Sequence, residues 1–206
     1  MGSGGLERDV VALKKSPVAR LVERRLKEFG RNPDWFSELC FCISTANASS
    51  EAGLRFQEKS RGKLRNASER QLGEWLKESG CRFYNNKARF IAEARGKLDS
   101  KKLEKTVKGF ENGFRARAWL VENVKGLGWK ESSHFLRNVG FKNLAILDRH
   151  VLGVLKERGV ILELKLSPKK YLEIEEKLEA LCRKTGLNQA ELDLFLWFSK
   201  TGKVLK

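Results

Sequence analysis

The sequence has few prolines and no long apolar run. Only 3 of its 206 residues are proline, which argues against a Pro-rich, low-complexity protein. No apolar stretch approaches the roughly 20 residues that a membrane-spanning helix needs, and the densest patch, residues 39–43, is far too short. Residues 1–5 lack the apolar stretch of a signal peptide and are typical of a flexible end or a remnant of cloning. These absences predict a protein that is neither membrane-spanning nor secreted.

The four cysteines are not spaced like metal ligands. Cys40 and Cys42 are two residues apart, so on a helix they face different directions. There is no CxxC pair, and neither histidine stands at a ligand-like spacing from a cysteine. We therefore expect no metal and no redox cofactor, and we expect buried, reduced thiols in a cytoplasmic protein.

Positive charge, by contrast, is abundant. The chain has 42 Lys and Arg residues against 26 acidic residues, a formal net charge of +16 and a pI near 9.9. Such an excess attracts polyanions through counterion release. Nucleic acid is therefore the favoured partner, while a generally basic surface is the alternative that charge alone leaves open.

Helical periodicity dominates the chain, and the alternation typical of strands is almost absent. We predict an all-α fold, a compact multi-helix globule with both chain ends in one lobe and the middle of the chain in another, around a cleft. The predicted helices cover about residues 6–29 (with a break at Ser16 and Pro17), 35–45, 50–60, 68–80, 85–97, 114–124, 129–139, a segment after Asp148, 167–183 and 188–202.

Residues 121–130 hold the most informative local pattern. Gly126 and Gly128 flank Leu127 between two predicted helices, so the backbone can turn sharply and present amide groups at the start of the second helix. With the charge of Lys125, these amides would bind a DNA phosphate without reading bases. A plain connection between two helices is the alternative, and the net charge favours the phosphate-binding hairpin.

Lys130 lies in the first turn of that second helix, where the helix dipole and partial burial both disfavour its charged form. A neutral amine is a nucleophile that forms Schiff bases, although a solvated lysine is the alternative. Asp148 precedes a further helix, and taken alone it is best interpreted as an N-cap. Held beside an amine, a carboxylate also stabilises positive charge developing at a deoxyribose C1′.

Together these residues resemble the helix-hairpin-helix DNA glycosylase superfamily, and more closely its archaeal-type (type 2) 8-oxoguanine DNA glycosylase/AP lyase family. The resemblance extends from about Trp35 to the terminus. Its signatures are residues 35–47, 82–84, 133–140, 192–197 and 201–206. The four-cysteine cluster of endonuclease III-like members is absent, which implies no iron–sulfur centre, and the length implies no additional β-domain.

The resemblance implies a bifunctional enzyme that flips 8-oxoguanine out of double-stranded DNA, cleaves its N-glycosidic bond and nicks the abasic strand by β-elimination. Lys130 would attack C1′ and form the Schiff base, and Asp148 would assist base departure. Phe83 and Trp197 would stack on the flipped base, with core packing an equal alternative for Phe83. Lys206, the last residue, would help to distinguish 8-oxoguanine from guanine.

Two further residues complete the predicted site. His134 shares a helix face with Lys130 and would touch DNA or tune the amine, a packed histidine being the favoured alternative. Arg149 would contact a phosphate. The expected partners are double-stranded DNA containing 8-oxoguanine and abasic-site DNA.

The whole chain is interpreted as one glycosylase/lyase domain over residues 1–206, with the helix-hairpin-helix at about 114–139. We expect a monomer in the cytoplasm, on the nucleoid of a prokaryote. One rival is a monofunctional glycosylase for another damaged base, which Lys130 argues against. Another is a non-enzymatic DNA-binding module, which Lys130 and Asp148 together argue against.

Overall fold

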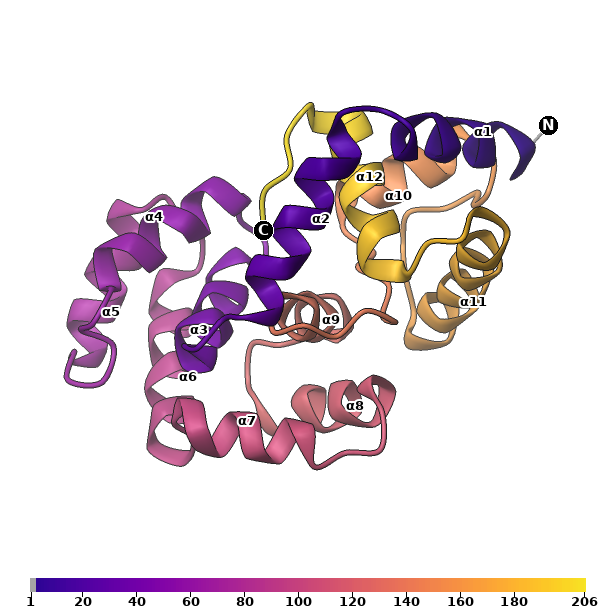
Figure 1. The fold of residues 1–206 in the computed structure, drawn as a ribbon. Helices are drawn as coiled ribbons and strands as arrows, with labels where there is room; N and C mark the ends of the chain where they lie inside the picture. Colours follow the sequence, from indigo (N-terminus) through magenta and orange to yellow (C-terminus); the bar gives the residue numbers. More distant parts are fainter. Residues whose placement is uncertain (1–2) are drawn as a thin grey trace. The chain divides into compact units, whose positions relative to one another are not determined.

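A computed structural model describes residues 3–206, which form helices joined by turns and contain no strand (Figure 1). The all-α prediction is confirmed. The expectation for residues 1–5 falls partly on Met1 and Gly2, which lie outside the described residues, while Ser3–Gly5 open the first helix. No helix in the described range is long and apolar enough to cross a membrane.

The helices are α1 (Ser3–Lys14), α2 (Val18–Gly30), α3 (Trp35–Thr45), α4 (Ser50–Ser60), α5 (Glu69–Glu78), α6 (Tyr84–Lys97), α7 (Ser100–Lys108), α8 (Gly113–Asn123), α9 (Trp129–Asn138), α10 (Arg149–Glu157), α11 (Pro168–Thr185) and α12 (Gln189–Thr201). The predicted break at Ser16 and Pro17 is confirmed, because α1 ends and α2 begins on either side of it.

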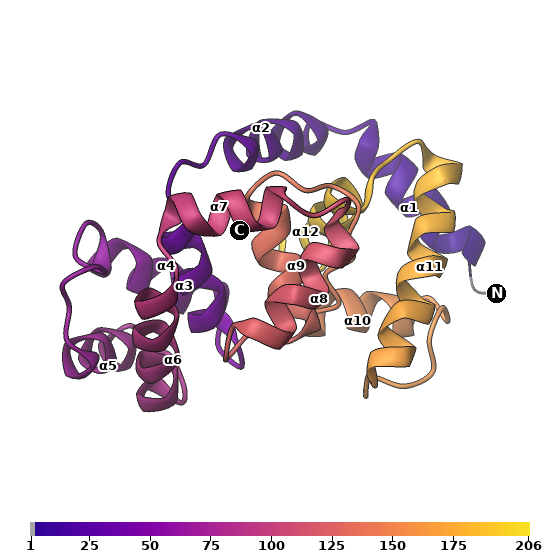
Figure 2. The same cartoon turned by 90° about the horizontal axis from the view of Figure 1, so that it is seen from below.

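The chain divides into two compact units. The end unit combines the chain up to Arg31 with the chain from Gly140 onward, and the middle unit is Asn32–Val139. In Figures 1 and 2 the end unit carries the indigo and the orange-to-yellow ends of the colour scale, and the middle unit carries the colours between them.

The middle unit is built around α3. Asp34 caps this helix by accepting a hydrogen bond from the backbone N–H of Ser37 at 3.0 Å. The sequence that follows is apolar on nearly every side, and Leu39, Phe41 and Ile43 are fully buried. Helices α4, α6, α7 and α9 all pack against α3. A helix that is apolar all round therefore becomes the core of this unit.

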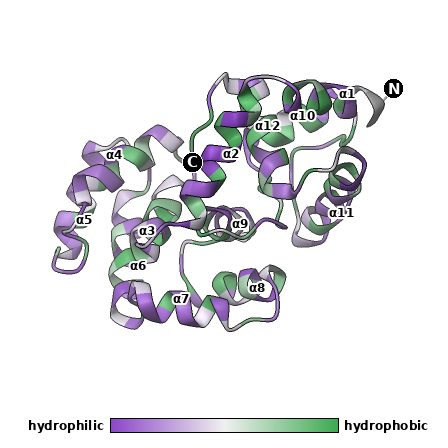
Figure 3. Cartoon of the chain, in the orientation of Figure 1, coloured by the Kyte–Doolittle hydropathy of each residue, from purple (hydrophilic) through white to green (hydrophobic). Residues whose placement is uncertain are grey.

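One helix of the middle unit, α7, was absent from the sequence prediction. Asp99 caps it by accepting from the backbone N–H of Lys102 at 2.8 Å. Its only buried residues are Leu103 and Val107, one turn apart in a segment otherwise dominated by lysine, and Figure 3 shows mainly hydrophilic residues along it. Two apolar residues are too few to give a clear helical period.

The end unit is organised around α12, which packs against α1, α2, α10 and α11. Gly202 ends α12 in the left-handed conformation, with φ of 69°. The terminal segment then returns to the core, because Val204 is buried in a cluster with Val22, Phe29, Leu194 and Phe195. The end of the chain is thus anchored by a buried side chain.

Candidate active site and nucleic-acid interface

The hairpin between α8 and α9 uses its two glycines differently. Gly126 has a φ of +88°, and a Cβ added there would lie 2.7 Å from Cδ2 of Phe90, so both the backbone and the packing require glycine. Gly128 has a φ of −91°, which any residue adopts. Its amide donates to Oε2 of Glu131 at 3.3 Å, so the hairpin is joined to the first turn of α9.

The backbone of the hairpin is suited to bind a phosphate, but not every hairpin side chain that we predicted is free to do so. The side chain of Leu127 is buried, so only its backbone could meet DNA. The first amides of α9 have no acceptor within the helix, and they lie at its positive end. The ammonium of Lys125 lies 2.9 Å from Oε2 of Glu93, and this hydrogen bond lowers the pKa of the Glu93 carboxyl. Part of the charge of Lys125 is therefore already neutralised.

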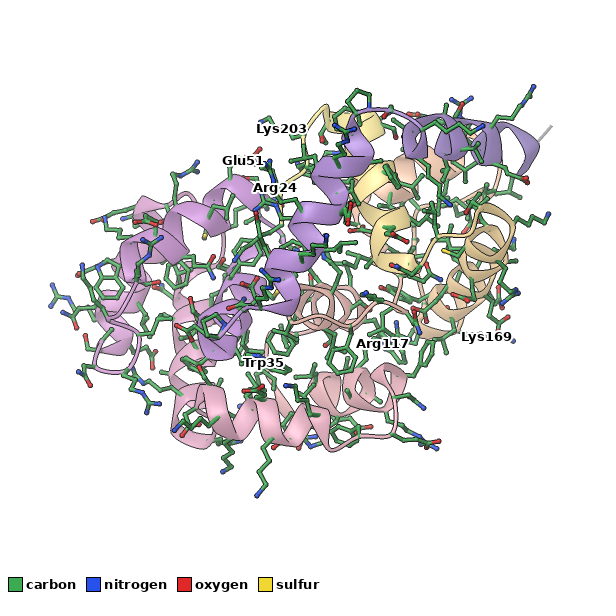
Figure 4. All side chains as sticks on the ribbon, in the orientation of Figure 1. Arg24, Trp35, Glu51, Arg117, Lys169 and Lys203 are labelled. Carbon is green, nitrogen blue, oxygen red and sulfur yellow. The ribbon has the colours of Figure 1, made fainter. Side chains whose placement is uncertain are left out.

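A buried arginine, labelled in Figure 4, joins the two helices of the hairpin. The guanidinium of Arg117 lies 4.7 Å from the ring centroid of Trp129 and 5.5 Å from that of Phe114. Its Nη1 also donates to Oγ of Ser133 at 3.1 Å. These contacts join α8 to α9 at the start of α9.

Lys130 is the second residue of α9, and its side chain is 24% exposed. Its Nζ lies 3.7 Å from Oε1 of Glu131, the carboxylate whose other oxygen accepts the Gly128 amide. One carboxylate thus both caps the helix and faces the amine. Glu131 was not among the predicted site residues, although its spacing from Gly128 is that of a capping residue.

A second lysine of the middle unit lies in the same charged surroundings. Lys87 is 4% exposed, and its Nζ donates to the backbone carbonyl of Ser44 at 2.7 Å. Burial lowers the pKa of Lys87, and its charge interacts with those of Lys130 and Glu131. Sequence reasoning missed this residue, although it falls on the buried stripe of α6 with Ile91 and Ala94.

Phe83 stands at the start of α6 in an unusual conformation. Its φ of 55° and ψ of 36° are left-handed, which costs a non-glycine residue roughly 1–2 kcal/mol. The residue is 56% exposed, so the core-packing alternative for it is wrong. The guanidinium of Arg82 lies 5.3 Å from its ring centroid. A solvent-exposed aromatic ring on a strained backbone is suited to stack on another ring.

In the end unit, Asp148 is the N-cap of α10. Its Oδ1 accepts from the backbone N–H groups of His150 at 2.9 Å and Val151 at 2.8 Å. The N-cap interpretation is therefore confirmed. The chemical role of Asp148 stays a prediction. Because both hydrogen bonds end on Oδ1, the cap fixes the direction of the whole carboxylate.

His150 connects two predicted site residues and was itself not predicted. Nε of Arg149 donates to its Nε2 at 3.2 Å, and its ring meets that of Trp197 edge-on, with centroids 5.7 Å apart and an interplanar angle of 75°. Arg149 is exposed and Trp197 half-buried. The structure thus brings a cation and an aromatic ring of the predicted interface together through a histidine.

The remaining predicted residues differ in their surroundings. His134 is buried and packs its ring edge-on against Phe41 at 5.6 Å between centroids, which agrees with the packing alternative. Lys206 follows buried Val204 by two residues, so it is held close to the core of the end unit.

The described residues hold no cluster of potential metal ligands. Among them, no group of three or more His, Cys, Asp and Glu side chains could hold an ion. All four cysteines are buried and carry no disulfide. Burial raises the pKa of Cys182 to about 12, so its thiol stays protonated at neutral pH.

The chain is similar in sequence and in fold to known proteins. Residues 19–187 match the Ogg-HhH family, described as 8-oxoguanine DNA glycosylase. The chain is 46% identical over 211 aligned positions to an 8-oxoguanine DNA glycosylase/AP lyase of Korarchaeum cryptofilum, covering 100% of both chains. It is 43% identical to one of Methanocaldococcus jannaschii, with 98% of this chain and 99% of the relative covered.

Two crystal structures have similar folds. That of the Methanocaldococcus jannaschii 8-oxoguanine glycosylase/lyase in complex with a 15-mer DNA containing 8-oxoguanine matches with a TM-score of 0.92 and 42% identity, over 98% of this chain and 99% of that one. The 8-oxoguanine DNA glycosylase of Thermotoga maritima matches with a TM-score of 0.90 and 40% identity, over the same shares of the two chains.

Proposed function

Because this chain belongs to the 8-oxoguanine DNA glycosylase family, we propose that it excises 8-oxoguanine from double-stranded DNA and then cleaves the abasic strand. The observation that carries the proposal is the position of Lys130, a partly exposed amine in the first turn of the helix that follows the hairpin. The relatives covered over nearly their whole length are named as both glycosylase and AP lyase, which supports both steps. The net charge of +16 suits a DNA substrate.

The proposed chemistry begins at Lys130. Its neutral amine attacks C1′ of the damaged nucleotide as the N-glycosidic bond breaks and the base leaves with the bonding electrons. The C1′–O4′ bond then opens to give the Schiff base, a proton is lost from C2′, and the C3′–O bond breaks. The carboxylate of Asp148 stabilises the positive charge that develops at C1′ and takes up a proton from the attacking amine.

Several of the predicted residues have a proposed role in binding the DNA. The hairpin, through the amides of Gly126, Leu127 and Gly128 and the ammonium of Lys125, binds a backbone phosphate of the DNA. Arg149 binds another phosphate. The exposed ring of Phe83 and the half-buried ring of Trp197 stack on the flipped base, and the anchored Lys206 distinguishes 8-oxoguanine from guanine.

Borohydride trapping tests this proposal. The chain is incubated with sodium borohydride and a duplex that carries one 8-oxoguanine, beside an undamaged duplex and one with a preformed abasic site. We expect covalent adducts on the 8-oxoguanine and abasic duplexes only. Release of the base without an adduct would indicate a monofunctional glycosylase, and binding without base release would indicate a binding module; either result would overturn the proposal.

The proposed steps use only side chains of this chain, so we expect undiminished cleavage in excess EDTA. A single chain carries all the proposed groups, which supports action as a monomer. The DNA substrate supports a place in the cytoplasm, on the nucleoid in a prokaryote. Sedimentation of the DNA complex would measure the stoichiometry, with one chain per lesion expected.

A further inference from the structure

The segment that leads into Asp148 is buried although it has no regular structure. Residues 141–147 form neither helix nor strand, and the side chains of residues 144–147 are each at most 4% exposed. Buried backbone N–H and C=O groups need hydrogen-bond partners, and outside a helix or a sheet these partners must come from other elements. The segment before Asp148 therefore depends on groups that the rest of the end unit supplies.

Two side chains of α11 supply these partners. The hydroxyl of Tyr171 donates to the backbone carbonyl of Ala145 at 2.6 Å and accepts from the backbone N–H of Leu147 at 3.4 Å. Oε1 of Glu175 accepts from the backbone N–H of Ala145 at 2.7 Å. Tyr171 and Glu175 are four residues apart, so they lie on the same face of α11, and both are buried. We call these two residues the α11 clamp.

The start of α12 holds the clamp and the segment from the other side. Gln189, the first residue of α12, is buried, and its Nε2 donates to the backbone carbonyl of Glu175 at 3.1 Å. The next residue, Ala190, donates its backbone N–H to the carbonyl of Lys142 at 3.0 Å. Hydrogen bonds from two helices thus fix the backbone of the segment before Asp148.

The position of the clamp has a consequence for Asp148. The N-cap fixes the carboxylate relative to α10, whereas the clamp fixes the backbone on the other side, up to Leu147, which directly precedes Asp148. Satisfying buried backbone groups explains how the clamp stabilises the fold. A carboxylate that stabilises charge at C1′ must also be placed accurately, because a displacement of about 1 Å can cost about 10²-fold in rate.

We propose that Tyr171, supported by Glu175, is a positioning residue that holds Asp148 where its carboxylate can act on C1′. This inference rests on the proposed function, because it concerns the carboxylate that assists base departure. Tyr171 does not touch the reacting atoms in this proposal, so its effect on the rate must pass through Asp148.

A double-mutant cycle with Asp148 tests the inference. Tyr171→Phe removes only the hydroxyl, and Glu175→Leu removes the acceptor of the Ala145 amide while keeping a side chain of similar size. Thr185→Val is the matched control, since it removes a buried hydroxyl of the same helix whose hydrogen bonds stay within α11. Each change is made in the parent and in Asp148→Asn, and circular dichroism checks folding. The assay titrates each protein against an 8-oxoguanine duplex under single-turnover conditions and measures the maximal rate of base release and the protein concentration that gives half of it.

The clamp variants should slow the chemical step without weakening DNA binding. For Tyr171→Phe we expect the maximal rate to fall about 10-fold and the half-saturating concentration to stay within about 2-fold. In Asp148→Asn the same change should alter the rate by no more than about 2-fold, because the carboxylate that it positions is already absent. Glu175→Leu should behave alike, and Thr185→Val should have no effect in either protein.

Several results would overturn the inference. Equal losses from Tyr171→Phe in the parent and in Asp148→Asn would show that the hydroxyl acts independently of Asp148, and an unchanged rate in the parent would show that it has no such role. If Tyr171→Phe does not fold, Glu175→Leu decides by the same criterion, and failure of both to fold would identify the clamp as a requirement of the fold alone. Base release by the parent would leave the glycosylase step of the proposed function standing in each of these cases, whereas a parent that releases no base would overturn both.

Discussion

The starts of α9 and α10 are both closed by a carboxylate that accepts backbone amides, but the carboxylate comes from a different position in each. At α10 the carboxylate of Asp148 accepts two backbone amides and lies at the positive end of a helix, which stabilises the fold by about 1 kcal/mol. At α9 the cation of Lys130 lies at the same kind of end, where the helix dipole opposes it. Glu131 provides the cap there instead.

This difference shows which residue is informative about function. An aspartate before a helix is explained by the helix itself, so its presence says little about chemistry. A partly buried lysine in a first turn does not cap the helix, so the helix alone does not explain it. Variants of Lys130 therefore test the chemistry directly, and variants of Asp148 separate its capping role from a chemical one.

Replacing Lys130 should give the largest effect. In Lys130→Gln we expect strand cleavage in single-turnover assays to fall by at least about 10³-fold, because the nucleophile is lost. The melting temperature should stay the same or rise slightly, because a cation leaves the positive end of a helix. Lys97→Gln, at the exposed lysine of α6, is the control and should match the parent. Retained cleavage in Lys130→Gln would exclude this lysine as the nucleophile.

Two variants of Asp148 should distinguish its capping role from its chemical role. Asparagine caps helices about as well as aspartate, and alanine costs about 1 kcal/mol. We therefore expect Asp148→Asn to keep the stability of the parent and Asp148→Ala to lose about 1 kcal/mol in thermal unfolding. Both variants should excise 8-oxoguanine about 10²-fold more slowly. A fully active Asp148→Asn protein would leave Asp148 as a cap alone.

Phe83 should affect catalysis without supporting the fold. Phe83→Gly removes the stacking ring, worth about 1–3 kcal/mol per base, so excision of 8-oxoguanine should slow by roughly 5- to 100-fold. Glycine adopts the left-handed conformation freely, so the free energy of unfolding should be unchanged or up to about 1 kcal/mol higher. Phe83→Trp should restore most of the rate. A clear loss of stability in Phe83→Gly would identify the ring as a packing element.

Variants of the terminal segment should give the smallest effects. Val204 should affect stability, and Lys206 should affect selectivity. Val204→Ala should lower the free energy of unfolding by roughly 1–2 kcal/mol, because it removes buried methyl groups. Deleting Lys206 should leave stability unchanged and reduce the preference for 8-oxoguanine over guanine several-fold in competition assays. Unaltered selectivity after the deletion would remove Lys206 from the site.

Most of the helices could be predicted from the sequence, because caps and apolar periods lie within each segment. Helix α7 could not, since only Leu103 and Val107 mark its buried face. Its stability comes from packing against α3, a helix distant in the sequence. The hairpin at Gly126 was predictable because its signal is also local.

The site was less predictable where geometry depends on the rest of the fold. Lys87 falls on the apolar stripe of α6, but a lysine there is ordinarily taken as a break in the stripe, and only the structure shows the Ser44 carbonyl that it meets. The left-handed backbone of Phe83 has no signal in its sequence. His150 joins Arg149 to Trp197 only because α10 packs on α12.

The most direct test of the account is to map the trapped adduct. After borohydride reduction on an 8-oxoguanine duplex, nuclease and protease digestion followed by mass spectrometry identifies the residue that carries the deoxyribose remnant. We predict that the remnant is on Lys130. A remnant on Lys87 or on any other amine would contradict this prediction, because Lys130 would then not be the nucleophile.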